Sequence, residues 1–181
     1  MALSEFQKRK CALAFYRYDL SKDGVVEALD FDMAGQKLAE LQGFEPGSLE
    51  YGKITSAFKT EWDTFLKPAD QDGDDKLTLD EYIKLAEQLI EGPNATEINL
   101  SVNQHLFDII DLDGDGTINT NEFVIFLKAR AITEEEAKFA FSKLDVDNSG
   151  SISRKQFAKH LMDYYRSNDA AAPGNWFYGS Y

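Results

Sequence analysis

The chain has 181 residues, of which 28% are charged, and its formal net charge is −13. This length suffices for one domain with a sizeable core or for two small lobes. The acidity argues against nucleic acid as a partner. No hydrophobic run is long enough for a membrane span, and the N-terminus lacks the hydrophobic region of a signal peptide. The single cysteine, Cys11, excludes an internal disulfide and fits a reducing compartment, so we expect a cytoplasmic protein.

The first predicted helix begins at Ser4, which has capping-box spacing to Gln7, and Asn94 stands in a looser version of the same relation to Glu97. Further helices are expected around 33–42 and 49–68. Gly-Pro breaks occur at 43–47 and 91–94. Amphipathic helical stripes flank four acidic segments, which begin at the following residues: Asp19, Asp70, Asp111 and Asp145.

The four acidic segments are twelve residues long and contain half of the 32 Asp and Glu residues of the chain. Position 8 of each is aliphatic, which favours short strands that pair loop with loop. These residues are Val26, Leu77, Ile118 and Ile152. The repeat predicts an all-α fold of four helix–loop–helix units, in two pairs packed into one compact globule. The first pair occupies 1–92 with loops 19–30 and 70–81, and the second occupies 93–166 with loops 111–122 and 145–156.

Each twelve-residue loop has the ligand spacing of a calcium site. Such a loop supplies oxygens from positions 1, 3, 5, the carbonyl of 7, position 9 and a two-oxygen carboxylate at 12, and position 6 favours Gly. The third loop, DLDGDGTINTNE, meets every requirement. Its predicted ligands are Asp111, Asp113, Asp115, the Thr117 carbonyl, Asn119 and Glu122. We expect Ca²⁺ here.

The two N-terminal loops each depart from the pattern at one position. The second loop has Asp75 rather than Gly at position 6; its ligands are Asp70, Asp72, Asp74, the Lys76 carbonyl, Thr78 and Glu81. The first loop has Asp30 at position 12, and its shorter side chain suits the six-fold coordination of Mg²⁺ as well as Ca²⁺. The ligands of the first loop are Asp19, Ser21, Asp23, the Val25 carbonyl, Glu27 and Asp30. We expect both loops to bind.

The fourth loop keeps two carboxylates and has a neutral Gln156 at position 12. Its set is Asp145, Asp147, Ser149, the Ser151 carbonyl, Ser153 and Gln156. We expect this loop to be weak or empty and to serve as the pairing partner of the third.

The C-terminal tail, 167–181, contains Trp176, Phe177 and Tyr178, which are costly to leave in water. We expect it to fold into a cleft between the two halves.

No enzymatic constellation is present, so we expect no catalytic activity. Three functions remain: a Ca²⁺/Mg²⁺ buffer, a sensor that docks a target protein, and a carrier of an apolar small molecule. Sensors expose Met-rich grooves, whereas this chain has three Met and thirteen Phe. A stiff aromatic core favours the buffer. We also expect a monomer, with no indicated protein target and no membrane contact.

The pattern resembles one group of the EF-hand superfamily, the sarcoplasmic calcium-binding proteins and calerythrin, with coelenterazine-binding protein nearby. Asp30 at position 12 of loop one, the long gap before loop two and the aromatic tail carry this resemblance. It implies two EF-hand pairs in one globule, cytosolic calcium buffering, and active loops one to three. Coelenterazine-binding relatives have a degenerate second loop, and the acidic loop at 70–81 counts against that function here.

Overall fold

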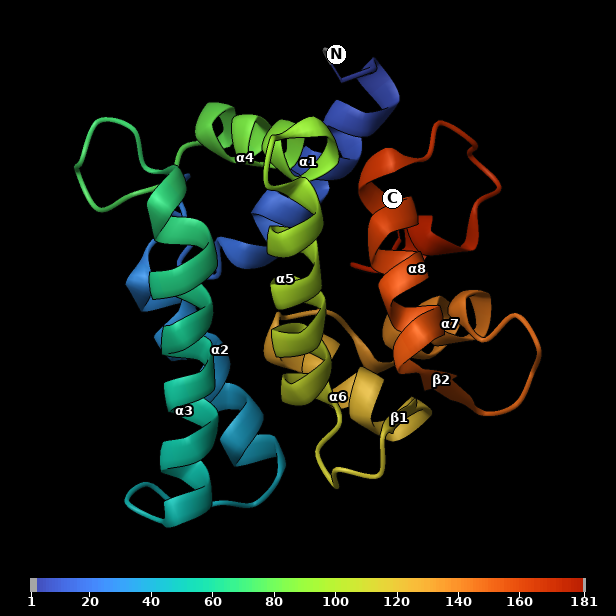
Figure 1. Ribbon diagram of the computed structural model, residues 1–181. Coiled ribbons are helices and arrows are strands. Elements are labelled where there is room, and N and C mark those ends of the chain that lie inside the picture. The colour runs from blue at the N-terminus through green and yellow to red at the C-terminus, as the bar shows by residue number, and fades with distance from the viewer. Residues whose placement is uncertain (1–2, 181) are drawn as a thin grey trace.

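The computed structural model describes residues 3–180, so the extreme ends of the first and last predicted segments, 1–2 and 181, lie outside it. The N-terminal half contains α1 (Glu5–Tyr18), α2 (Ala28–Leu41), α3 (Leu49–Glu61), a π-helical turn η1 (Trp62–Leu66), η2 (Lys67–Ala69) and α4 (Leu79–Glu91). The C-terminal half contains α5 (Ala95–Ile110), β1 (Thr117–Asn119), α6 (Thr120–Ala129), α7 (Glu134–Leu144), β2 (Ser151–Ser153), α8 (Arg154–Arg166) and η3 (Pro173–Trp176). Figure 1 shows α2 and α3 on one side, α5 in the middle, and α7 and α8 on the other.

The predicted loop pairings are confirmed. β1 and β2 run antiparallel with Ile118 opposite Ile152, and Val26 and Leu77 form a single antiparallel bridge. All four of these aliphatic side chains are buried. The first loop therefore pairs with the second, and the third with the fourth, as the all-α fold with two loop pairs requires.

One predicted helix changes character along its length. The stretch expected to be helical over 49–68 is α-helical to Glu61, then π-helical from Trp62 to Leu66, and 3₁₀ from Lys67 to Ala69. Pro68 explains why regular α geometry does not continue, because it lacks an N–H and its ring clashes with the carbonyl four residues earlier. Trp62, the first residue of the π-helical turn, is buried.

Aromatic side chains from both halves form one continuous core. Phe31 packs on Trp62 in the N-terminal half, and Phe107 packs edge-on to Phe157 in the C-terminal half. Phe177 contacts Phe157 at a centroid distance of 5.1 Å. Tyr178 contacts Tyr18 of α1 and Tyr164 of α8, at 5.9 and 4.9 Å. The C-terminal segment thus contributes buried rings that contact both halves.

Side chains of helix α1 also donate hydrogen bonds to the C-terminal end of α8. The Gln7 amide donates to the carbonyls of Tyr165 and Arg166, at 3.2 and 3.0 Å. The Lys10 ammonium donates to the Ser167 carbonyl and to Asn175 Oδ1, both at 2.9 Å. A cation at the carboxyl end of a helix interacts favourably with its dipole. Burial lowers the pKa of Lys10 to about 8.

Candidate metal centres

The residue at position 12 is held in the same way in all four loops. Position 9 is the N-cap of the outgoing helix, and its backbone N–H donates to the side chain at position 12, which is residue N3 of that helix. The distance is 2.9 Å in each case: Glu27 to Asp30, Thr78 to Glu81, Asn119 to Glu122 and Ser153 to Gln156. A capping box therefore pre-positions the side chain that closes each candidate site.

The third loop lies between α5 and α6 and has the most complete donor set. Glu122 is buried, and its Oε1 accepts from the backbone N–H of Leu112 at 2.9 Å. Burial raises the pKa of Glu122 above its ordinary value. Carboxylate oxygens of Asp111, Asp113 and Asp115 all lie within 4.8 Å of one another. Such a cluster is suited to a hard divalent cation.

Asp111 carries the most direct indication of a cation site in the third loop. Its Oδ2 accepts from the Gly116 N–H at 3.0 Å, whereas its Oδ1 is buried without a hydrogen-bond partner among the described residues. Buried polar atoms nearly always have a partner, so this unpaired carboxylate oxygen is placed as a cation ligand would be. The donor set, which consists wholly of oxygens, fits Ca²⁺ at this point.

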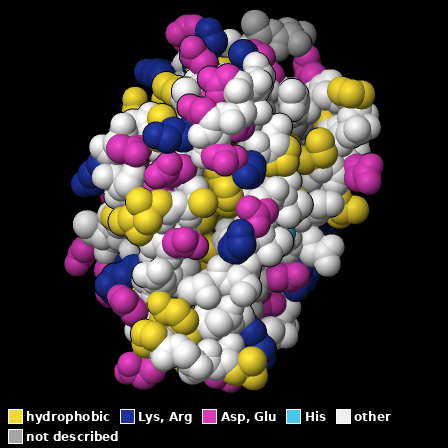
Figure 2. All heavy atoms as spheres, turned by 90° about the vertical axis from the view of Figure 1, so that its left-hand side faces the viewer, with side chains coloured by type: hydrophobic (Ala, Val, Ile, Leu, Met, Phe, Trp, Pro, Cys, Tyr) yellow, Lys and Arg dark blue, Asp and Glu magenta, His cyan; other side chains and the backbone are white. Residues whose placement is uncertain are grey.

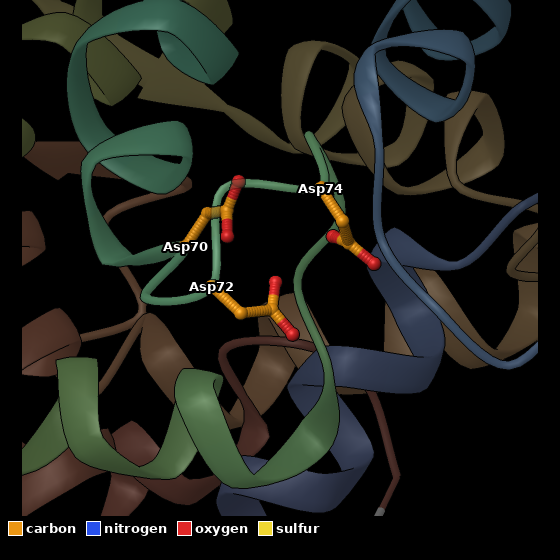
Figure 3. Close-up of side chains that lie close together, drawn as sticks. All are labelled: Asp70, Asp72 and Asp74. Carbon is orange, nitrogen blue, oxygen red and sulfur yellow. The ribbon is translucent and has the colours of Figure 1, made fainter.

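The second loop brings the same three positions together. Carboxylate oxygens of Asp70, Asp72 and Asp74 lie within 4.8 Å of one another, and Figure 3 shows the three side chains arranged around the inside of the loop. The nearby charge of Asp74 raises the pKa of Asp72. A bound cation would relieve this repulsion. Glu81 closes the loop, and backbone hydrogen bonds lower its pKa.

The substitution at position 6 of the second loop is accommodated locally. Asp75 adopts a left-handed backbone with φ of 62°, a region that Asp tolerates better than most residues. Its carboxylate lies 2.6 Å from the ammonium of Lys67. Asp75 thus faces a cation on η2 rather than adding a further repulsive charge to the ligand set.

In the first loop, the side chain at position 12 is more completely buried than in the second and third loops. Asp30 is 1% exposed and accepts from the N–H groups of Ser21 and Glu27 at 2.8 and 2.9 Å. Burial raises the pKa of Asp30. Asp19 accepts from the N–H of Gly24 at 3.0 Å. Three carboxylates do not converge here as in loops two and three, because a serine occupies position 3.

The fourth loop satisfies its own acceptors. The Gln156 amide donates to Asp147 Oδ2 at 3.1 Å, so position 12 donates to position 3 where an ion would require both to accept. The Ser149 hydroxyl donates to the Ser151 carbonyl at 2.9 Å. Hydrogen bonds from Ser149 lower the pKa of Asp147. These internal hydrogen bonds use side-chain oxygens at positions that supply ligands in a calcium loop.

Gln156→Glu is expected to convert the fourth loop into a calcium site. The substitution replaces the donor at position 12 by a second acceptor oxygen and restores the missing charge. Isothermal titration should show one additional calcium per molecule. A matched Gln36→Glu change, on the exposed face of α2, adds the same charge outside the four loop sequences and should leave the stoichiometry unchanged. Unaltered stoichiometry for Gln156→Glu would show that the carboxylate at position 12 is insufficient for binding here.

Two basic side chains near the loops, Arg154 and Lys67, were not anticipated from the calcium-loop pattern. Arg154 of loop four places its guanidinium 3.7 Å from Asp111 Oδ2 and 2.7 Å from Asp108. The antiparallel register, which sets Thr117 opposite Ser153, brings position 10 of one loop toward position 1 of the other. That register was the signal that could have identified Arg154. Lys67, beside Asp75, has no comparable signal in the sequence.

Comparisons with known proteins agree with this geometry. Residues 100–162 match the family model for an EF-hand domain pair. Calerythrin from Saccharopolyspora erythraea is 29% identical over 154 residues, 83% of this chain and 87% of calerythrin. Luciferin-binding protein from Renilla reniformis is 28% identical over 181 residues, 96% of this chain and 94% of that protein.

The fold has close structural counterparts. The calcium-loaded apo form of coelenterazine-binding protein from Renilla muelleri superposes with a TM-score of 0.81 at 23% identity, covering 99% of this chain and 100% of that one. Sarcoplasmic calcium-binding proteins are also among the relatives. Residues 100–162 thus match an EF-hand domain pair, and calerythrin and the sarcoplasmic calcium-binding proteins are among the homologues of the chain.

Proposed function

We propose that the protein is a Ca²⁺/Mg²⁺ buffer that binds metal at loops 19–30, 70–81 and 111–122 and leaves loop 145–156 empty. The observation that carries metal binding is the buried, unpartnered Oδ1 of Asp111 beside two further carboxylates. Loop one, closed by the shorter Asp30, is the site at which Mg²⁺ competes most strongly. The protein has no catalytic role in this proposal, because every carboxylate cluster that the described residues form belongs to a metal loop.

Support for a buffer rather than a sensor comes from the closed core. Phe177 and Tyr178 are 0% and 1% exposed, and the Tyr178 ring contacts both Tyr18 of α1 and Tyr164 of α8. We propose that the tail expected over 167–181 fills a cleft between the halves with its buried aromatic residues, Phe177 and Tyr178. On the face in Figure 2, charged and polar side chains divide the hydrophobic ones into separate groups. That face does not offer a broad apolar docking surface.

The carrier function is the second candidate, because two similar proteins are named for luciferin or coelenterazine binding. A space bordered by Tyr18, Tyr82, Tyr165 and Tyr178 does lie between the halves, but its volume is about 40 Å³. Pockets for drug-sized ligands are typically about 300–1,000 Å³. Hollows of 350–390 Å³ among the described residues are open surface grooves. These sizes favour the buffer.

We place the buffer in the cytoplasm as a monomer. Cys11 is buried, and burial raises the pKa of its thiol to about 12. A protonated, buried thiol is inert and does not form a disulfide with a second copy. Among the described residues, no helix is long and apolar enough to cross a membrane.

A calcium titration of the chelator-stripped chain in about millimolar Mg²⁺ tests this proposal, since Mg²⁺ at that level competes at mixed sites. Isothermal titration should report three calcium ions per molecule. A dye that brightens on apolar surface should give a flat or falling signal during binding. A rising dye signal would contradict the buffer and indicate a groove that opens for a target, and a stoichiometry below three would remove one of the proposed sites.

A further inference from the structure

The first metal loop is joined directly to the C-terminal segment. Tyr18, the last residue of α1, immediately precedes Asp19 and is 7% exposed. Its hydroxyl lies 3.2 Å from the hydroxyl of Tyr178, and the two rings are in contact at 5.9 Å. The residue that enters the loop is thus hydrogen-bonded to a residue 160 positions later.

The residue that follows the first loop packs against the same Tyr18 ring. Phe31 directly follows Asp30, and its ring stacks on Tyr18 with centroids 5.5 Å apart and an angle of 26° between the planes. Phe31 also packs on Trp62 at 5.6 Å. A cation that draws Asp19 and Asp30 onto one centre would fix both neighbours of the Tyr18 ring. It would therefore fix the direction of the Tyr18 hydroxyl.

A second contact joins the same turn of α1 to the segment. Arg17 donates to Glu136 Oε1 at 2.6 Å, and the same oxygen accepts from the backbone N–H of Ser180 at 2.9 Å. Arg17 and Glu136 are both about three-quarters buried. Consecutive residues, Arg17 and Tyr18, thus reach the C-terminal segment by independent routes, one charged and one hydroxyl-mediated.

The hydroxyl contact is anchored in a buried polar cluster. Tyr18 donates to Glu61 Oε1 at 3.1 Å, and Glu61 is paired at 3.2 Å with Arg130, the residue that follows α6. The Tyr178 hydroxyl lies 3.4 Å from that of Tyr165. Such networks have few alternative arrangements, because a buried group that loses its partner pays the desolvation penalty of an unsatisfied polar atom.

We propose that metal binding at loop one is energetically coupled to the seating of residues 173–180 through the Tyr18–Tyr178 contact. The cation strengthens the seat of the segment, and the seated segment strengthens cation binding by the same factor, as thermodynamic linkage requires. Loss of metal from loop one then loosens the C-terminal segment. This inference rests on the proposed function, because it requires that loop one bind a divalent cation.

The coupling is tested by making loop one the reporting site. Glu81→Gln and Glu122→Gln silence loops two and three, and Trp176→Phe leaves Trp62, which contacts Phe31, as the fluorescent reporter. In this background, Tyr178→Phe should raise the calcium dissociation constant of loop one about threefold, the scale of one net hydrogen bond. Phenylalanine keeps the ring in place, so the variant should fold; circular dichroism checks this.

Two further variants separate the hydroxyl route from general loosening. Phe177→Leu alters the adjacent buried ring, which contacts Phe157 of α8 rather than the residues around loop one. This variant should change the calcium affinity of loop one less than twofold. Tyr18→Phe removes the same contact together with the hydrogen bond to Glu61, so it should raise the dissociation constant at least as much as Tyr178→Phe. Adding Tyr178→Phe to Tyr18→Phe should then cause little further increase, because the shared contact is already lost. In the opposite direction, a Trp62→Phe chain that retains Trp176 should show less acrylamide quenching of Trp176 once loop one is filled.

Each result decides the proposal. An unchanged dissociation constant in Tyr178→Phe overturns the coupling, and an equal effect of Phe177→Leu overturns its assignment to the Tyr18–Tyr178 contact. If loop one of the wild-type chain binds no metal, the three-site function fails and the coupling fails with it. If loop one binds and ignores Tyr178, the coupling alone is wrong.

Discussion

Glu122→Gln should eliminate calcium binding at loop 111–122 and reduce the stoichiometry of the chain from three to two. Glu122 is expected to supply two charged oxygens, and glutamine supplies one neutral oxygen with an N–H₂ group beside it. Loop four already shows the consequence of an amide at position 12: Gln156 donates to Asp147. By the same geometry, a glutamine at 122 should donate to Asp113 and close the loop without an ion.

Isothermal titration and thermal unfolding with and without calcium measure this effect. The variant should retain the calcium sites of loops one and two, because these pair with each other through Val26 and Leu77. In a Gln156→Glu background, Glu122→Gln should also weaken the new fourth site, since Ile118 and Ile152 join the two loops. A fourth site that titrates unchanged would contradict coupling through the strands. A retained third calcium in Glu122→Gln alone would show that Glu122 is not a required ligand.

The parts of the fold that were predictable depend on local spacing. Position 8 of each loop is aliphatic because that residue points into the core from a short strand, and the observed partners are Ile118 with Ile152 and Val26 with Leu77. The capping box at Ser4 and Gln7 also forms as expected. Both features involve residues a few positions apart, so their spacing in the sequence determines their geometry.

Features that depend on contacts between distant segments were not predictable. The side chain of Asn94 makes no capping hydrogen bond, although its spacing to Glu97 suggested one. The helix expected over 49–68 contains a π-helical turn before Pro68. The Glu61–Arg130 pair and the Tyr18–Tyr178 hydroxyl contact join residues 69 and 160 positions apart in the chain. Neither contact is indicated by hydrophobic periodicity. In the sequence, a polar or charged residue that is buried looks the same as one on the surface until its partner is known.

The Glu61–Arg130 pair yields the second large prediction. Their side chains are 2% and 1% exposed, and the guanidinium lies over the ring of Phe126 at 4.0 Å. Two Glu61 oxygens each accept from Arg130 Nη2 at 3.2 Å. Glu61→Gln retains the shape and removes the charge, which leaves a cation buried among aromatic rings. Loss of one partner of a buried pair typically destabilises a protein by about 3–5 kcal/mol.

For a chain of this size, that loss should lower the unfolding temperature by on the order of 10 °C, measured by differential scanning calorimetry at saturating calcium. Lys159→Met is the matched control: it breaks the solvent-exposed pair with Asp163 and should cost less than about 1 kcal/mol. The double variant Glu61→Gln/Arg130→Met removes the stranded cation as well and should recover much of the lost stability. If Glu61→Gln costs no more than the surface control, Arg130 reaches water by rearrangement. The pair would then be a minor contact, and the two halves would be held together mainly by their shared aromatic core.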